Sequence, residues 1–338
     1  MINYVYQLIR PGVISIKYED VESKNDVIVR PLYMAVCHAD QRYYRGMRDI
    51  DKLKNKLPMA LIHECVGEVV FDPHNAFEKG QKVTMIPNVK SKINDESIYE
   101  NYQKGSAFLS SGKDGFMREF VNLDVDRLVS IGSVSCQFAA ISEFISVGVH
   151  AVNRLIKNAN KNMNSFGIWG DGSLAYVVSC IIKQTFPKAK LCIVGRDLFK
   201  LSQFTFADET YFSDNIPKDF CIDHAFECAG GEGSYYAIDD IIKYINPQGT
   251  VMLMGVSENK VAINTRDVLE KGLKLIGSSR SGREDFEKAV EFLNEPTFQK
   301  RISRIIYEDA PVGSISDIHR VFETDLKTPF KTVFKWNL

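Results

Sequence analysis

The chain lacks several features that mark specialised protein classes. Neither sign of charge is in excess, with 42 Lys and Arg against 43 Asp and Glu, so no surplus of positive charge is there to hold nucleic acid or a membrane surface. Long apolar runs, internal repeats and low-complexity tracts are also missing, which argues against a membrane span, a collagen, a coiled coil or extended disorder. The chain has 338 residues, and 45% of them are hydrophobic. This length and composition predict a globular protein of about two domains.

Paired cysteines are absent as well. The seven cysteines are an odd number, and no C-x-x-C pair occurs among them. This pattern argues against a disulfide framework and favours a reducing compartment. The first residues do not combine a charged region with an apolar run, as a secretory signal would. We therefore expect a cytoplasmic protein.

The pattern of apolar residues changes at about residue 136. Before this point, short β-branched runs are separated by turns, which predicts strands. After it, strand-like runs alternate with helical patterns, which is typical of a parallel, doubly wound α/β sheet. A helix is expected over 136–155 from the spacing of its apolar residues, and the expected strands are 165–170, 190–194, 223–226, 250–254 and 273–276. We predict an α/β chain with a Rossmann domain over 147–282 and a second domain built from both chain ends, 1–146 and 283–338.

A glycine loop follows the first of these strands. It reads G-x-G-x-x-A, with Gly170, Gly172 and Ala175, and a helical pattern begins at once. The first glycine permits a tight turn, the second lets the backbone approach a pyrophosphate, and the small third residue allows close packing. A glycine-rich turn can occur in any α/β domain, but the position after a strand favours a dinucleotide site.

The end of the second strand indicates which dinucleotide binds. Sites for NAD place an acidic residue about 20 residues beyond the loop, where this chain has Gly195 and Arg196. A strand end without a carboxylate, followed by a cation, favours the 2′-phosphate of NADP(H). Lys200 is counted with Arg196 among the cofactor-binding residues. In the alternative, Arg196 is a solvated surface charge and Asp197 binds the ribose.

Four residues could form a catalytic metal site. Cys37 lies early in the chain, and His63 and Glu64 begin 26 residues later. Glu143 interrupts an apolar run, so this carboxylate must be paired or coordinating. A thiolate, an imidazole and a carboxylate together suit Zn²⁺ with one coordination position left open.

These motifs resemble the zinc-dependent medium-chain dehydrogenases/reductases. His63-Glu64-x-x-Gly67 is similar to that family's G-H-E-x-x-G signature, with Ile62 in place of the first glycine, and Cys37-x-x-Asp40 is similar to its first zinc-ligand loop. The segment 143–148 is similar to the E-P-L-S-V-G of its polyol dehydrogenase branch. The resemblance implies a mainly β, GroES-like catalytic domain made from both chain ends.

The same resemblance implies roles for individual residues. Zinc is held by Cys37, His63 and Glu64, with Glu143 at or near the metal. Asp40 matches the carboxylate that orients the zinc-bound imidazole. His38 matches a position near the cofactor pyrophosphate.

Two departures from the family pattern change the expectations. The segment 88–114 contains no cysteine, whereas the family often carries a structural zinc on four cysteines there, so we expect a single zinc. Ala39 stands where the family usually has a Ser or Thr that relays the proton. The proton then needs another route, through a water near Glu64 or Glu143 or through a nearby tyrosine.

Five runs narrow the resemblance to the ribulose-5-phosphate reductases, the ribitol-5-phosphate 2-dehydrogenases that supply CDP-ribitol for teichoic acids and capsules. They are 32–34, 40–46, 112–117, 167–172 and 270–281. The resemblance implies NADPH-dependent, zinc-assisted reduction of D-ribulose 5-phosphate to D-ribitol 5-phosphate. It also implies a homodimer and an association with the cytidylyltransferase of the same pathway.

The substrate phosphate needs a cation. Five candidates lie in segments that the family places around its cleft: Arg42, Arg45, Lys113, Arg280 and Arg283. Arg42 comes first because it follows Cys37 by only five residues, and Arg280 second because it follows the strand ending at Ile276. Each could instead be a solvated surface charge.

Two other functions stay open at this point. One is a zinc polyol dehydrogenase acting on an unphosphorylated polyol or ketose. The other is a non-catalytic NADP-binding sensor, against which the intact set of Cys37, His63 and Glu64 weighs.

Overall fold

The structure is a computed structural model that describes residues 2–21, 25–93 and 95–338. The chain divides into two compact units, 1–146 with 281–338, and 147–280. The second unit is thus a continuous segment inserted between the two parts of the first. Helix α4 (Ser142–Asn158) begins in the first unit and continues into the second.

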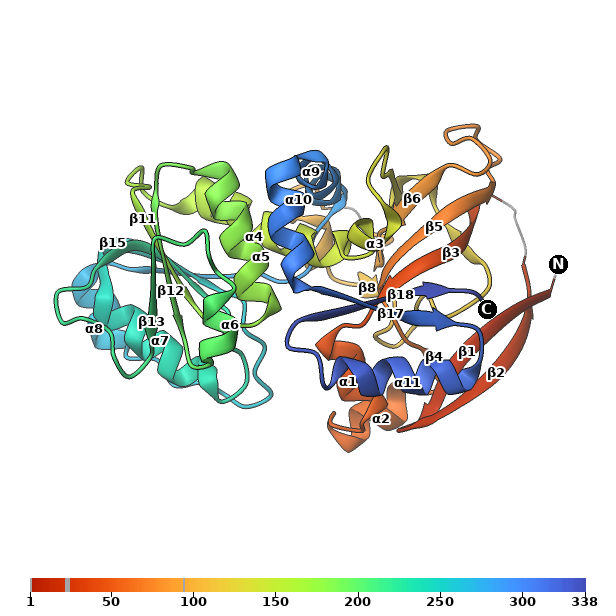
Figure 1. Ribbon diagram of the computed structural model, residues 1–338, viewed down its shortest axis with the longest axis horizontal. Coiled ribbons are helices and arrows are strands. Elements are labelled where there is room, and N and C mark those ends of the chain that lie inside the picture. The colour runs from red at the N-terminus through yellow and green to blue at the C-terminus, as the bar shows by residue number, and fades with distance from the viewer. Residues whose placement is uncertain (1, 22–24, 94) are drawn as a thin grey trace. The chain divides into compact units, whose positions relative to one another are not determined.

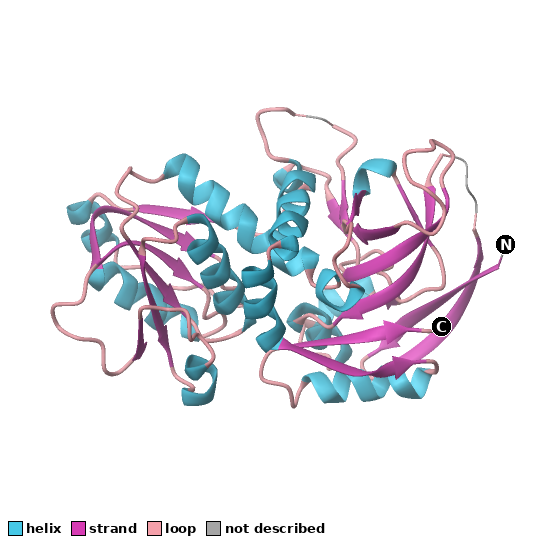
Figure 2. Cartoon of the chain, turned by 45° about the horizontal axis from the view of Figure 1, so that its top comes forward, coloured by secondary structure: helices cyan, strands magenta, loops and turns pink. Residues whose placement is uncertain are grey.

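The second unit contains one parallel sheet of six strands. Its order is β13-β12-β11-β14-β15-β16, which is the doubly wound order of a dinucleotide-binding fold. The strands are β11 (Ser165–Trp169), β12 (Lys190–Gly195), β13 (Glu209–Phe212), β14 (Ile222–Glu227), β15 (Ile245–Leu253) and β16 (Lys274–Gly277). The connecting helices are α5 (Ser173–Thr185), α6 (Leu198–Ser202), α7 (Gly233–Tyr244) and α8 (Thr265–Lys271). Helices flank this sheet on both sides (Figure 2), which explains why its central strands β12 and β14 are buried almost throughout, including the polar residues of β14.

The first unit is mainly β. A seven-stranded sheet has the order β10-β6-β5-β3-β18-β17 with β9 on β3, and a three-stranded sheet has the order β2-β1-β4. The strands are β1 (Ile2–Arg10), β2 (Val13–Asp20), β3 (Val27–Ala35), β4 (Met59–Ala60), β5 (Glu64–Phe71), β6 (Lys82–Met85), β7 (Asn88–Val89), β8 (Ala107–Phe108), β9 (Val121–Leu123), β10 (Leu128–Ser130), β17 (Ile306–Val312) and β18 (Lys331–Trp336). The α/β class with a Rossmann sheet and a GroES-like unit is confirmed.

Both chain ends contribute to the first unit. Strand β18, near the C-terminus, pairs antiparallel with β3, and the two lie side by side in Figure 1. A shared apolar core includes Met34 from β3 and Phe334 from β18, both almost fully buried. The helical segments of this unit are α1 (His38–Tyr44), α2 (Ile50–Lys56), η1 (Glu100–Tyr102), η2 (Val125–Arg127), α3 (Cys136–Ala139), α9 (Arg283–Asn294), α10 (Pro296–Ile302), η3 (Ser303–Ile305) and α11 (Ile315–Asp325).

One expectation about helices is corrected. The region 136–155 reads as a single helix from its apolar spacing, but the structure has two, α3 and α4, separated at Ala140 and Ile141. The hydroxyl of Ser142 donates to the carbonyl of Ala139 at 2.7 Å, which is an alternative to continuing the first helix. In the described part of the chain, no helix combines the length and hydropathy needed to cross a membrane.

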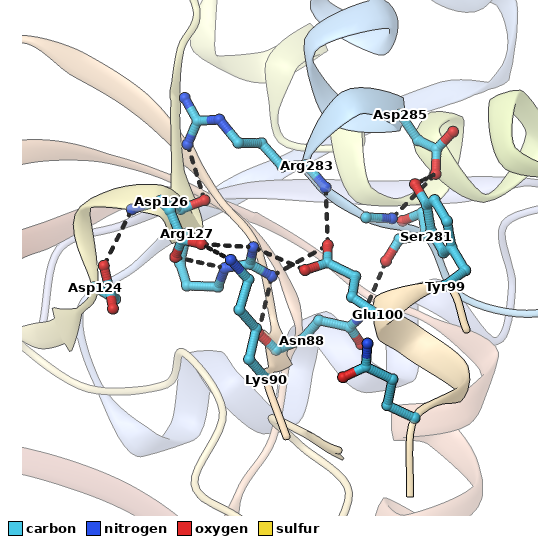
Figure 3. A network of polar contacts seen from close by, with 12 residues as sticks. Asn88, Lys90, Tyr99, Glu100, Asp124, Asp126, Arg127, Ser281, Arg283 and Asp285 are labelled. Carbon is cyan, nitrogen blue, oxygen red and sulfur yellow. Dashed lines mark hydrogen bonds and ion pairs between the residues drawn. The ribbon is translucent and has the colours of Figure 1, made fainter. Parts of the chain in front are cut away.

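The segment 88–114 is held by an ion-pair network rather than by cysteines; Asn94 within it lies outside the described residues. Arg127, whose side chain is 6% exposed, donates to Glu100 at 3.0 Å and to Asp126 at 3.0 Å. Figure 3 shows these carboxylates on either side of the guanidinium. Of these two carboxylates only Glu100 lies in the segment, so this contact ties the segment to the buried Arg127.

The same network fixes the point where the chain re-enters the first unit. The backbone N–H of Arg283 donates to Glu100 at 3.0 Å, and the Tyr99 hydroxyl donates to Asp285 at 2.8 Å (Figure 3). The Arg283 side chain donates to the carbonyls of Asp126 and Leu128 at 2.8 and 2.9 Å. Arg283, one of the five cations considered for the substrate phosphate, is therefore engaged in structure.

Replacing Arg127 by Met should destabilise the first unit by about 3 kcal/mol, because removing one partner leaves the carboxylates of the network without their buried cation. The midpoint of denaturant unfolding measures this. Lys90→Met is the matched control, because Lys90 pairs with the same Asp126 but is 53% exposed. Lys90→Met should lower the free energy of unfolding by no more than about 0.5 kcal/mol. Equal losses in the two variants would show that burial does not set the strength of this network.

Candidate active site

The three residues predicted as zinc ligands lie together in the first unit. The donor atoms of Cys37, His63 and Glu64 are all within 4.8 Å of one another, and in the described residues this is the one such group of His, Cys and acidic side chains. The sheet brings them together, because Ala35 at the end of β3 pairs with Glu64 at the start of β5. Cys37 lies two residues after the end of β3 and forms the N-terminal boundary of α1.

Asp40 links these ligands to the surrounding structure. Its carboxylate is fully buried, and Oδ2 lies 3.3 Å from Nδ1 of His63. Oδ1 accepts from the backbone N–H of Ile62 at 3.0 Å and from the Ser110 hydroxyl. Burial alone would raise the pKa of Asp40, but His63 and these hydrogen bonds lower it below its ordinary value. An ionised carboxylate at Nδ1 orients the imidazole so that Nε2 is available to a metal.

His63 itself is strongly basic in this environment. Burial lowers its pKa, but Asp40 and Cys37 outweigh burial, and the pKa of His63 ends well above its ordinary value. A metal at this site must therefore displace a proton from the imidazole.

The residue before His63 has an uncommon backbone conformation. Ile62 has a φ of 67°, in the left-handed region where a β-branched residue is an outlier. The family signature has glycine at this position, which adopts that conformation without strain. The strain, on the order of 1–3 kcal/mol, is offset by burial of the whole Ile62 side chain in the core of the first unit. The bend directs the Ile62 N–H at Asp40 and so helps to place the neighbouring His63.

Lys331 is a residue of this site that sequence reasoning missed. Lys331 is the first residue of β18. Its ammonium donates to Glu64 Oε1 at 2.5 Å and to the carbonyl of Val36 at 2.7 Å. The same ammonium lies over the ring of Phe144. The side chain of Lys331 is 5% exposed. The signal was available, because a lysine that begins an apolar strand needs a buried partner just as Glu143 does.

Glu143 is buried in the first turn of α4, near the three ligands but outside the group whose donors meet within 4.8 Å. Burial raises its pKa to about 7, with a further contribution from Glu64, while His63 and Lys331 act in the opposite direction. Glu143 can therefore hold or release a proton near neutral pH.

The residues present fit a zinc ion. A thiolate, an imidazole and a carboxylate are a donor set that zinc prefers. The surroundings of Glu64 also favour a metal ion. Lys331 binds Oε1 of Glu64, whereas Oε2 is buried without a hydrogen-bond partner among the described residues. A metal ion would satisfy that oxygen.

The glycine loop of the second unit has the geometry that its sequence predicts. Gly170 has a φ of 133°, and a Cβ there would lie 2.9 Å from the backbone of Cys228. At Gly172 a Cβ would meet nothing within 4 Å, so the loop is open there. Ala175 is fully buried under the sheet. No side chain caps the 13-residue helix α5, which leaves its first N–H groups for phosphate oxygens.

The end of β12 differs from the expectation in one respect. We expected no carboxylate at this point, and neither Gly195 nor Arg196 provides one. However, Asp171 of the glycine loop reaches it, and its Oδ2 accepts from the backbone N–H groups of Arg196 and Asp197 at 2.6 and 2.8 Å. The carboxylate comes from 25 residues earlier in the chain, so counting forward from the loop could not reveal it. The Arg196 side chain is exposed beside Gly233.

The remaining predicted residues occupy separate places. His38 is exposed at the start of α1, and burial together with Arg42 lowers its pKa. Arg42 lies in the last turn of the same helix. Lys200 lies in α6, and Arg280 follows β16 with a left-handed φ of 58°. Their contacts with cofactor and substrate stay predictions.

Known proteins match this chain over its whole length. The Alcohol dehydrogenase GroES-like domain family matches residues 23–133, and the Zinc-binding dehydrogenase family matches residues 206–295. The ribulose-5-phosphate reductase of Streptococcus pneumoniae is 55% identical, with 100% of this chain and 98% of that protein covered. Ribulose-5-phosphate reductase 1 of Staphylococcus aureus is 47% identical, with 99% of each chain covered.

A solved structure agrees with these matches. The crystal structure of S. aureus TarJ in complex with NADPH has a TM-score of 0.89 and 43% identity, and each chain is covered completely. The resemblance expected from the motifs is therefore confirmed. The chain belongs to the zinc-binding medium-chain dehydrogenases/reductases, in the group of the ribulose-5-phosphate reductases.

Proposed function

We propose that this protein reduces D-ribulose 5-phosphate to D-ribitol 5-phosphate with NADPH and one catalytic zinc, and so supplies CDP-ribitol for teichoic acid or capsule synthesis. The observation that carries the proposal is 55% identity over the full chain to a ribulose-5-phosphate reductase, with the cluster of Cys37, His63 and Glu64 formed in the structure. The same cluster argues against a non-catalytic sensor.

The residues of the first unit prepare the site for a ketone. When bound, zinc supplies a Lewis acid for a ketone oxygen, and NADPH supplies a hydride. Cys37, His63 and Glu64 would hold the metal, and Asp40 orients the imidazole through Nδ1. The ammonium of Lys331 neutralises one oxygen of Glu64, which keeps a buried carboxylate tolerable beside the thiolate.

The product alcohol also needs a proton, and Ala39 has no hydroxyl to relay one. We propose that Glu143 supplies the protonatable group, because its carboxyl is buried beside His63 and Glu64 and this burial raises its pKa. It lies close enough to His63 and Glu64 for their charges to act on it. A water between Glu143 and the substrate would complete the route.

The proposal also covers the oligomeric state of the protein, its partner enzyme and its place in the cell. We propose a homodimer, since strand β16 ends the six-stranded sheet and leaves backbone groups that a second copy could pair. We also propose association with the cytidylyltransferase that consumes the product. All seven cysteines are free thiols, as a reducing cytoplasm would maintain them.

The decisive assay compares D-ribulose 5-phosphate with D-ribulose while NADPH oxidation is followed. We expect the phosphorylated ketose to have a kcat/KM larger by at least about 100-fold, because a phosphate held by two cations adds two charge-assisted contacts. Arg42 and Arg280 are the candidates for these cations from the sequence. Equal turnover of the two ketoses would favour the unphosphorylated polyol dehydrogenase instead.

Cys37→Ser should abolish zinc binding and activity but leave the fold, because the apolar cores of both units remain intact. Metal analysis should find one zinc per wild-type chain. Since zinc must displace a proton from His63, apparent zinc affinity should fall by at least about tenfold for each pH unit below the raised pKa of His63. Competition with a chromophoric chelator measures this.

The control for this experiment is Cys221→Ser, since Cys221 is an exposed free thiol in the second unit. It should keep one zinc and full activity. A Cys37→Ser protein that retains zinc with wild-type affinity would contradict the ligand assignment.

Arg196→Ala should reduce the preference for NADPH over NADH, measured as the ratio of the two kcat/KM values, by about 10- to 100-fold. This is the change expected when one charge-assisted hydrogen bond to the 2′-phosphate is lost. Arg266→Ala is the control, because Arg266 is exposed in the same unit and pairs with Glu270 on its own helix. An unchanged ratio of the two kcat/KM values in Arg196→Ala would assign the 2′-phosphate to another residue.

A further inference from the structure

Two cations gather around one buried tyrosine of the first unit. Tyr43, in α1, is only 3% exposed. The guanidinium carbon of Arg48 lies 4.9 Å from the centre of its ring, and the ammonium nitrogen of Lys56 lies 5.8 Å from it. Arg48 follows α1, and Lys56 is the last residue of α2. Neither cation was among the residues considered from the sequence.

A single turn connects this group to the candidate zinc ligands. The turn follows β8 and is closed by a hydrogen bond from the N–H of Ser111 to the carbonyl of Phe108 at 3.1 Å, so its ends are less than about 7 Å apart. At one end, the ring of Phe108 packs edge-on against His63, with centres 5.3 Å apart. At the other end, the Ser111 hydroxyl accepts from Lys56 at 2.9 Å. Between them, Ser110 bonds to Asp40.

The group has capacity for a ligand. Within the described chain, Lys56 has no carboxylate within 4 Å, and its hydrogen bond to Ser111 uses one of three N–H donors. The Tyr43 hydroxyl makes no hydrogen bond to another described residue, and it is not one of the buried polar atoms that lack a partner, so a ligand can reach it.

The positions on α1 distinguish this group from Arg42. Residues four apart lie on the same face of a helix, so Arg42 shares a face with His38, and Tyr43 shares a face with Ala39. The His38 face corresponds to the expected cofactor pyrophosphate, and the Ala39 face corresponds to the position that relays a proton to the substrate. Lys56 and Arg48 lie against Tyr43, so they are on the face of α1 that the family resemblance assigns to the substrate.

We propose that Lys56 and Arg48 bind the phosphate of the sugar-phosphate substrate, with the Tyr43 hydroxyl donating to a substrate oxygen. This inference rests on the proposed function, because it assigns the part of that site that recognises the phosphate. It explains how a ketose is selected by its phosphate end while its ketone lies at the metal. The ligand class is a phosphate monoester of a small polyhydroxy ketone.

The test uses the full-length zinc-loaded protein and two ketoses, D-ribulose 5-phosphate and D-ribulose. Lys56→Gln removes the charge but keeps a side chain that can donate to Ser111, so it spares the turn. It should raise KM for ribulose 5-phosphate by about 10- to 100-fold and change kcat and KM for ribulose by less than about twofold. Lys56→Arg should restore most of the loss, and Arg48→Gln should act in the same direction as Lys56→Gln.

Lys54→Gln is the matched control, because Lys54 is exposed two residues away on the same helix. It should behave as wild type with both ketoses. Zinc content and thermal unfolding of every variant are measured alongside, so that a structural effect is visible. Inorganic phosphate should inhibit wild type competitively against ribulose 5-phosphate, and Lys56→Gln more weakly.

The outcomes separate this inference from the proposed function. If wild type does not prefer ribulose 5-phosphate, the proposed function fails. If wild type prefers it and the Lys56 and Arg48 variants keep the preference, the phosphate subsite proposed here is wrong, and Arg42→Gln and Arg280→Gln in the same series test the sequence candidates. Equal losses with both ketoses, or loss of zinc in Lys56→Gln, would show a structural role and overturn the inference.

Discussion

The first unit depends on one buried carboxylate. Asp40, in α1, has no exposed surface, yet it lies against His63 and the backbone of Ile62 in one stretch of chain and the Ser110 hydroxyl in another, so it joins three stretches in all. A buried charge is tolerated only when its partners satisfy it, so the three stretches must meet at this point. The carboxylate thereby sets the ring of His63, the bend before β5 and the turn after β8 at once.

A second buried charge pair completes the arrangement. Lys331 from the C-terminal strand neutralises Glu64 from the N-terminal part of the chain, and both side chains are buried. The candidate site is thus closed by residues 267 positions apart. This explains why the chain must return to its first unit after the inserted second unit, since without β18 the carboxylate of Glu64 would be buried alone.

The two units satisfy their polar groups in different ways, the second through backbone N–H groups and the first through ion pairs. In the second unit the carboxylate of Asp171 binds backbone N–H groups at the end of β12, and the uncapped helix α5 leaves others for a phosphate. In the first unit the segment 88–114 contains no cysteine and depends on Arg127 with its two carboxylates. Ion pairs of this kind are directional, so the contact between Arg127 and Glu100 favours one arrangement of the segment.

The sequence by itself determined the class of the fold and the identity of the chemistry. Alternating strands and helices, the glycine loop and the unusual Glu143 in an apolar run are local patterns, and local patterns reflect backbone periodicity and the cost of burying charge. Cys37, His63 and Glu64 could be named for the same reason, because their residue types and motifs are read along the chain.

Only the tertiary structure decided which distant groups meet. Lys331 beside Glu64, Asp171 at the end of β12, and Lys56 with Arg48 around Tyr43 are contacts that no spacing rule predicts. The two helices in 136–158 likewise depend on a side-chain hydrogen bond that competes with helix continuation. The physical reason is common to all of them. The partner of a charged or polar side chain is chosen by the packing of strands and turns in three dimensions, whereas the sequence shows only that such a partner is needed.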